Sequence, residues 1–303
     1  MTATTEFLGA TVRTATPLLL AATGELLVER AGIIFVGIEG SILAGALAAA
    51  AGGLAFGPGA GAVLAVLAGG ATAALFALFV VRWRTEQIVT GTAITLVASG
   101  GTAALYHSLF GPEGAGLRVP VIGPVALPGL TAIPVLGAAL FTQSLFTYTA
   151  IVALGSVWWL MTRTHLGLAL RACGERPGAA RAAGIATERR RAAAAVAAGA
   201  FGGAAGASLV LVQSGTFAEG MSAGRGFIAI AIVALGRWRP GGVLLAAVAF
   251  GGANALQYLF QARGWTLPYQ AFLALPYVAT LVALATARAN GAAPAALGQA
   301  DAD

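Results

Sequence analysis

Residues Arg163–Arg191, RTHLGLALRACGERPGAARAAGIATERRR, form the one long charged segment in the interior of an otherwise strongly apolar chain. Seven of the chain's 17 basic residues lie in this charged loop, namely Arg163, Arg171, Arg176, Arg181, Arg189, Arg190 and Arg191. Apolar runs long enough to span a bilayer flank it on both sides. Basic segments beside membrane spans are retained in the cytoplasm, so the charged loop is predicted to be cytoplasmic and to set the orientation of the other segments.

The composition indicates a membrane protein. Of 303 residues, 58% are hydrophobic and only 9% are charged, and the mean hydropathy is +0.87. A soluble domain carries about 25% charged residues. We therefore expect an all-α, polytopic helical membrane protein in contact with the lipid bilayer. The net charge of +6 does not indicate a nucleic-acid partner, because the arginines lie at the ends of apolar runs.

The sequence also excludes several kinds of catalytic site. It has no Lys, which excludes a Schiff-base lysine and a phosphate-binding loop of the G-x-x-x-x-G-K-[ST] type. The single cysteine, Cys173, cannot form an internal disulfide, and no His/Cys/Asp/Glu cluster has metal-ligand spacing. Both aspartates lie in the C-terminal tail, so no Ser/His/Asp triad is credible. We expect no catalytic residues, no metal, no cofactor bound by this chain and no signal peptide at the N-terminus.

The apolar runs predict eight to nine spans in a single transmembrane domain, residues 1–290, followed by a disordered tail, residues 291–303. The runs are about Thr11–Val28, Ala31–Gly52, Gly59–Val81, Glu86–Phe110, Gln143–Thr162, Ala192–Val212, Phe227–Gly236, Gly241–Ala262 and Pro268–Ala287. Residues 111–142 contain five of the 12 prolines and are predicted to form an external loop with short re-entrant or surface pieces. In the run 192–212, Gly199 and Gly203 are four apart, as are Gly202 and Gly206, which predicts a close helix contact.

The arginines support this topology. With the charged loop inside, nine crossings place the N-terminus outside and the C-terminus inside. Thirteen arginines then lie inside and four outside, the four being Arg13, Arg118, Arg225 and Arg263. One span more or fewer before the charged loop would remove this bias.

Two segments are predicted to be broken or re-entrant helices. They are Glu29–Gly40, ERAGIIFVGIEG, and Ala223–Gly241, AGRGFIAIAIVALGRWRPG. Irregular backbone at membrane depth is tolerated only when it is buried in protein or lines a cavity. The two segments start on opposite sides, which favours an inverted repeat, although chance similarity between Gly/Ala-rich segments is an alternative. The candidate gate glycines are Gly32, Gly37, Gly40, Gly224 and Gly226.

Three polar residues within the apolar runs are candidates for a substrate path. Glu39 lies about eight residues into its run, where an ionisable residue is costly. Either it faces a pathway, or its carboxyl satisfies backbone N–H groups freed at a helix break. Asn254 and Gln257 lie three residues apart on one helix face. They could bind a polar solute or, as is commoner, hydrogen-bond neighbouring helices.

Four segments together resemble the permease subunits of bacterial ABC importers for nucleosides and simple sugars, within the group that includes the ribose and branched-chain amino-acid permeases. The segments are Thr16–Gly45, which contains GELLVERAG and VGIEG; Gln87–Gly91, QIVTG; the charged loop's RTHLGLALRACGERPGAARAAGI; and Glu219–Phe250, which contains AGRGF and LGRWRPGG. They occur in the expected order across about residues 15–260. Phe35, a further substrate-path candidate, stands where this group usually has Asn, and Arg176 where an Asn often precedes the proline.

The resemblance implies a transport subunit that hydrolyses no ATP itself. Its partners would be cytoplasmic ABC ATPase subunits that bind the ATP, a second permease subunit in a homo- or heterodimer, and an external solute-binding protein. The charged loop would dock on the ATPase, and Gly178–Ile185 is predicted to be a short helix of small residues. The candidate coupling residues are Gly174, Glu175, Pro177, Ala180, Ala183, Gly184 and Ile185. Without the resemblance, a merely solvated basic loop is the alternative.

Other functions stay open at the level of sequence. An ion-coupled secondary transporter would use Glu39 as a proton site. A permease for branched-chain amino acids and a membrane scaffold without transport are further alternatives. The resemblance favours the ATP-driven importer in the bacterial cytoplasmic membrane.

Overall fold

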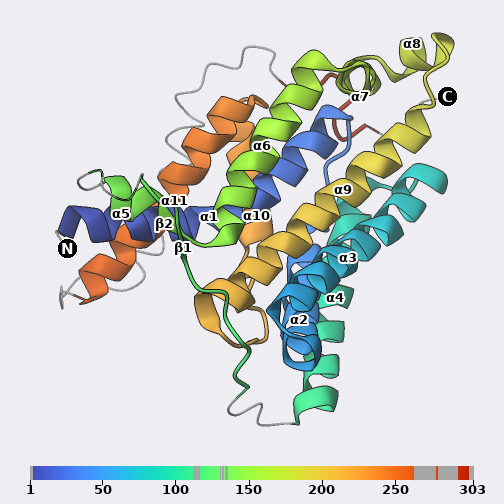
Figure 1. Cartoon of the computed structure of the whole chain (residues 1–303). Coiled ribbons are helices and arrows are strands. Elements are labelled where there is room, and N and C mark those ends of the chain that lie inside the picture. Colours follow the sequence, from blue (N-terminus) through green and yellow to red (C-terminus); the bar gives the residue numbers. More distant parts are fainter. Residues whose placement is uncertain are drawn as a thin grey trace.

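The computed structural model describes residues 3–111, 117–129, 131, 133, 136–262, 278 and 293–299, which are mainly helical (Figure 1). The long helices are α1 (Ala3–Arg30), α2 (Ile38–Phe56), α3 (Pro58–Ala77), α4 (Gln87–Phe110), α6 (Leu145–Arg163), α9 (Thr187–Ser208) and α11 (Pro240–Ala262). The shorter ones are α5 (Leu136–Leu140), α7 (His165–Glu175), α8 (Pro177–Ala182) and α10 (Arg225–Leu235). The π-helical turns η1 (Leu78–Arg82) and η2 (Leu209–Ser214) extend α3 and α9.

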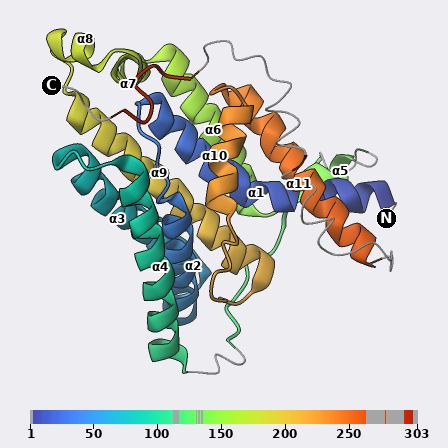
Figure 2. The same ribbon diagram turned by 180° about the vertical axis from the view of Figure 1, so that it is seen from behind.

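Helix α9 lies at the centre of the bundle and packs against α1, α2 and α3 (Figures 1 and 2). Its glycines make this possible. A Cβ at Gly203 would overlap the carbonyl oxygen of Ala65 in α3, and one at Gly206 would overlap that of Ile42 in α2. Gly199 likewise touches α3 and Gly202 touches α2. The close contact predicted from the four-residue spacing is confirmed, and it joins two neighbouring helices rather than one.

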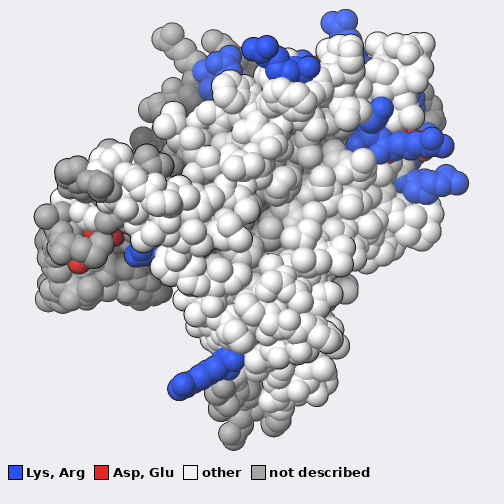
Figure 3. Space-filling view, viewed as in Figure 1, with Lys and Arg blue, Asp and Glu red and all other residues white. Residues whose placement is uncertain are grey.

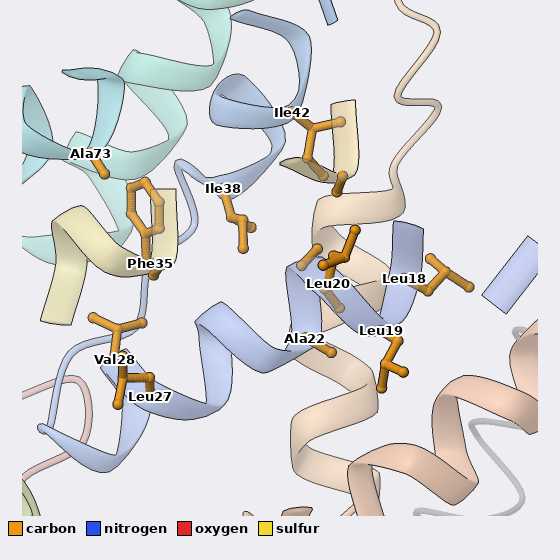
Figure 4. Close-up of a cluster of buried hydrophobic side chains, with 14 of the residues drawn as sticks. Leu18, Leu19, Leu20, Ala22, Leu27, Val28, Phe35, Ile38, Ile42 and Ala73 are labelled. Carbon is orange, nitrogen blue, oxygen red and sulfur yellow. The ribbon is translucent and has the colours of Figure 1, made fainter. Parts of the chain in front are cut away.

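The hydrophobic core lies where α1, α2, α3 and α9 meet. Figure 4 shows its side chains, among them Phe35, Ile38 and Ile42. The ring of Phe35 is fully buried and packs on Phe76, with the two ring centroids 4.7 Å apart. Lipid tails are as apolar as these side chains, so dispersion contacts within the bundle, rather than exclusion from water, hold such helices together.

Five helical segments among the described residues are long and apolar enough to cross a membrane. They are Ile38–Phe56, Pro58–Arg82, Gln87–Phe110, Leu145–Arg163 and Thr187–Ser214. Helix α10 is apolar but has only 11 residues, which corresponds to about 16 Å of helix. The predicted span at about Pro268–Ala287 lies outside the described residues. The chain is therefore a polytopic helical membrane protein, and the figure of eight to nine spans stays a prediction.

The structure adds short elements to residues 111–142 and differs from the expectation in the C-terminal tail. Residues 111–142 include β1 (Val125–Ala126), which pairs antiparallel with β2 (Thr142–Gln143), in addition to the short α5. The sequence predicts disorder for residues 291–303, but residues 293–299 are docked on the protein. The N–H of Ala296 donates to the carbonyl oxygen of Gly174 at 2.9 Å. Periodicity could not predict this docking, because the segment is short and binds through backbone groups.

The two ends of the bundle carry different charged side chains. Arg84 pairs with Glu188 of the charged loop across 3.9 Å, and in Figure 3 most of the Arg side chains on the visible face lie along its upper and right-hand edges. At the far end of α4, His107 and Glu219 approach to 2.7 Å. Arg30, Arg84 and the charged loop thus share one end, as the predicted topology requires.

The α9 packing predicts that a side chain at Gly203 destabilises the protein. Gly203→Leu has no space against α3, so we expect the free energy of unfolding to fall by about 1–3 kcal/mol or more. Thermal denaturation in detergent measures the effect. Gly155→Leu in α6 is the matched control, because a Cβ there meets no atom within 4 Å. Equal melting temperatures for the two variants would contradict the packing.

Candidate functional site

The first predicted break is real and covers the residues between α1 and α2. Residues 31–37 are not helical, and Gly32 has a φ of +91°, which favours glycine. Neighbouring side chains satisfy the freed backbone groups. The N–H of Phe35 donates to Glu25 Oε1 at 2.8 Å, and the N–H of Ile34 donates to Gln87 Oε1 at 2.9 Å. The break is therefore a defined structure rather than a loose linker.

The second break lies before α10. The chain leaves η2 at Gly215, passes through a turn, and enters α10 with Gly224 in the left-handed region at φ +78°. Gly224 is the N-cap and has no side chain to bond the first N–H groups of the helix. A helix end without such a partner leaves buried N–H donors unsatisfied.

Glu39, at the start of α2 just after the first break, accepts hydrogen bonds from these N–H groups. Its Oε1 accepts hydrogen bonds from Ser222 Oγ at 2.6 Å and from the N–H of Gly224 at 2.7 Å. Its Oε2 accepts one from the N–H of Gly226 at 2.6 Å. The side chain is only 6% exposed, and a Cβ at Gly226 would lie 2.6 Å from the Glu39 nitrogen. Three donors to one buried carboxylate at a helix N-terminus form a strong, charge-assisted contact.

The other end of α10 is tied to the same segment. The turn after α10 has positive φ at Arg237 and Trp238. The indole Nε1 of Trp238 donates to Glu29 Oε2, and Arg30 donates from Nε and Nη2 to the Trp238 carbonyl oxygen at 3.0 and 2.6 Å. Segment 29–40 therefore holds segment 223–241 at both ends. The two broken elements form one unit, which we call the clasp.

The charged loop forms two short helices, α7 and α8, joined at Arg176. The predicted coupling residues divide into two groups. Gly174 and Ala180 are buried, whereas Glu175, Ala183 and Gly184 are exposed, and Pro177 and Ile185 are half-buried. Gly184 lies two residues after the end of α8 and has a φ of +79°. A Cβ there would meet no atom within 4 Å. The outward group is available to a partner, and the inward group holds the loop on the bundle.

The inward side of the charged loop touches the first break directly. A Cβ at Gly32 would lie 3.2 Å from Gly174 Cα, and one at Gly174 would overlap the Arg30 carbonyl oxygen. Arg191 fixes this contact. Its side chain is 3% exposed, Nε donates to the Ala31 carbonyl oxygen at 3.0 Å, and Nη2 donates to the Cys173 carbonyl oxygen at 3.1 Å. The guanidinium thus links the loop to the clasp.

The C-terminal segment 293–299 covers the same contact. Besides its bond to Gly174, it accepts a hydrogen bond at the Gln299 carbonyl oxygen from Gln87 Nε2 at 3.2 Å. A Cβ at Gly298 would lie 3.2 Å from Ile34 Cδ1. Four parts of the chain therefore converge at one end of the bundle, namely residues 30–34, Gln87, the charged loop and residues 293–299. We call this contact the junction.

The predicted substrate-path residues do not form one site. Phe35 lies in the core and is fully buried. Glu39 lies at the contact of α2 with α10, whereas Asn254 and Gln257 lie on α11, which packs chiefly against α1. Gly37 is the N-cap of α2, and Gly40 packs α2 against Ala98 of α4. The roles of these residues in transport stay predictions.

Sequence reasoning missed four residues of the clasp and the junction, namely Glu25, Gln87, Arg191 and Ser222. Glu25 and Gln87 lie inside the segments that carry the resemblance, GELLVERAG and QIVTG, and could have been marked there. Arg191 was counted only as one positive charge among seven. Ser222 carries no signal that distinguishes it from other loop serines.

Comparison with known proteins settles the family. Residues 7–286 match the family described as branched-chain amino acid transport system / permease component. The chain belongs to this permease family. It is 36% identical to the putative glucose ABC transporter permease protein TsgC13 of Haloferax volcanii over 88% of this chain and 81% of that protein. It is 33% identical to the guanosine ABC transporter permease protein NupQ of Bacillus subtilis, over 95% and 94% of the two chains.

A third relative is the nucleoside ABC transporter permease protein NupC of Lactococcus lactis, 34% identical over 93% of this chain and 92% of that protein. No solved structure matches the permease. Membership of the family makes this chain a permease subunit of an ABC transporter, with a role in transport rather than catalysis. An ion-coupled transporter built on Glu39 is not favoured, because the family and the named relatives are permease subunits of ABC transporters.

The clasp predicts that Glu39→Gln weakens the fold. The amide has one acceptor oxygen and no charge, so at least one N–H of α10 loses its partner. Hydrogen bonds to charged groups contribute about 1.5–3 kcal/mol, and we expect the free energy of unfolding to fall by about that amount. Denaturation in detergent measures it, with the exposed Glu188→Gln as control. A Glu39→Gln permease as stable as the Glu188→Gln variant would rule out the clasp.

Proposed function

We propose that the permease moves a nucleoside or a simple sugar into the cell, driven by ATP hydrolysis on separate ATPase subunits docked on the charged loop. The observation that carries the proposal is the similarity to glucose, guanosine and nucleoside ABC transporter permeases over most of each chain. The family description also names branched-chain amino acids, which are therefore the second candidate substrate.

The geometry supports docking on the outward side of the charged loop. Glu175, Ala183 and Gly184 are exposed there, and α8 offers a short, small-residue surface that lets a partner approach closely. Movement of the loop would reach the clasp through Gly174 and Arg191, because both lie in contact with residues 30–32. Rigid-body movement of such packed elements is the usual way in which a remote site opens or closes a path.

The complete transporter would contain partners on other faces. Helix α4 exposes most of its side chains, among them Val89, Leu96 and Val97, and a second permease subunit is the partner we assign to that side of the bundle. A solute-binding protein would deliver the substrate at the end that carries His107 and Glu219.

For the orientation, we place the charged loop and the C-terminus in the cytoplasm and the N-terminus outside. The bond between Ala296 and Gly174 supports the first assignment, because it brings the C-terminal segment to the charged loop. Helix α1 supports the second, since its 28 residues correspond to about 42 Å, longer than the ~30 Å hydrocarbon core.

Reconstituted uptake tests the proposal. The permease, its ATPase and its binding protein are placed in proteoliposomes, and uptake of labelled guanosine, glucose and leucine is measured with and without ATP. We expect ATP-dependent uptake of guanosine or glucose. Uptake of leucine alone would favour the second candidate, and accumulation without ATP would contradict the importer.

The junction predicts that Arg191→Lys uncouples transport from ATP hydrolysis. An ammonium group cannot reproduce the planar fork that bonds the Ala31 and Cys173 carbonyl oxygens together. We expect ATPase activity to persist while substrate moved per ATP falls several-fold. Arg190→Lys, at an exposed neighbouring position, is the control. If both variants move the same amount of substrate per ATP, Arg191 is not needed to couple ATP hydrolysis to transport.

A further inference from the structure

A cavity of about 420 Å³ lies at the charged end of the bundle, outside the junction. The ends of α1 and α6, helix α7 and the start of α11 surround it. Its walls carry three arginines from separate elements, Arg30, Arg171 and Arg239, and two tryptophans, Trp158 and Trp238. None of the proposed steps of transport uses this cavity.

The arginines make the cavity electropositive. Arg30 uses Nε and Nη2 to bind the Trp238 carbonyl oxygen, which fixes its guanidinium in the wall. Arg171 and Arg239 are exposed, and neither forms an ion pair with a described residue. Two acids lie nearby. The negative charge of Glu175 attracts Arg30, and the buried Glu29 accepts a hydrogen bond from the Trp238 indole. The exposed guanidinium groups of Arg171 and Arg239 are therefore available to bind an anion.

The backbone adds donors on the same side. Helix α11 starts at Pro240, and Gly241 and Gly242 of its first turn line the cavity. Pro240 has no N–H and the N–H of Val243 donates to the Arg239 carbonyl oxygen, so Gly241 and Gly242 supply the first-turn N–H groups that favour a negative charge. A Cβ at Gly241 would meet no atom within 4 Å, so an anion can approach this backbone.

The surroundings indicate a lipid rather than a free ion. Trp158 is 59% exposed and Trp159 is 63% exposed, and tryptophans of this kind mark the level of lipid head groups. Below them, α6 exposes Val152 and Ile151 and α11 exposes Leu245, which gives acyl chains an apolar surface. Basic pockets between spans at the cytoplasmic side bind acidic head groups.

We propose that this cavity binds the phosphate-bearing head group of an anionic phospholipid of the inner leaflet. Arg171 and Arg239 hold the phosphate, with the first turn of α11 as a further donor. Because Arg30 and Trp238 also belong to the clasp, the bound lipid braces the turn that follows α10. The proposal does not depend on which substrate the permease moves.

Native mass spectrometry of the purified permease with phosphatidylglycerol tests the site. Each arginine near a membrane surface contributes about 1 kcal/mol, so Arg171→Gln with Arg239→Gln is expected to weaken phosphatidylglycerol binding about 30-fold. Retention of phosphatidylcholine and the melting temperature without phosphatidylglycerol should stay unchanged. The matched control is Arg189→Gln with Arg190→Gln, two exposed arginines at the same end of the bundle.

Three results would overturn the proposal. Equal weakening in the control would assign the effect to diffuse surface charge. Displacement of phosphatidylglycerol by inorganic phosphate at equal concentration would assign the cavity to a free anion. Unchanged phosphatidylglycerol binding in the double variant would show that Arg171 and Arg239 do not bind the lipid.

Discussion

Arg191 is buried at the point where the charged loop meets the break between α1 and α2, and its guanidinium bonds the carbonyl oxygens of Ala31 and Cys173. The Ala31 oxygen lies in the turn after α1, and the Cys173 oxygen lies in the last turn of α7, where carbonyl groups have no partner within the helix. Burying such groups is costly unless they are paired, and a fixed planar donor pairs both together. The loop and the break therefore cannot separate without leaving a charge and two carbonyl groups unsatisfied.

The clasp extends this link into the membrane. Glu39 caps α10, and Glu29 and Arg30 hold the turn at its other end. All three lie in one stretch of 11 residues, 29–39, which contains the break that Arg191 touches. We expect a short helix held at both ends by one segment to move with that segment, and the charged loop, the break and α10 are joined by one continuous chain of contacts. Family membership identifies a transporter, and this route shows how a remote partner could act on its membrane part.

Sequence patterns predicted the parts of this route but not their assembly. Hydropathy predicted the five described helical segments that are long and apolar enough to cross a membrane, and glycine spacing predicted the α9 contacts, because these features follow from local chemistry. The two breaks were predicted from charge and glycine within apolar runs. The pairing of Glu39 with Gly224 and Gly226 joins residues about 185 positions apart, and the docking of Ala296 on Gly174 joins residues 122 positions apart. No local pattern reports such contacts. The spacing of Asn254 and Gln257 suggested a path, yet both lie on a different helix pair from Glu39.

Hydrogen exchange on the assembled transporter tests the central claim most directly. Backbone exchange is compared by mass spectrometry between the nucleotide-free complex and the complex trapped with ATP and vanadate. The account predicts that exchange changes together in the charged loop, in residues 31–37 and in residues 215–226, which the clasp connects. A change confined to the charged loop, with both breaks unaltered, would contradict it.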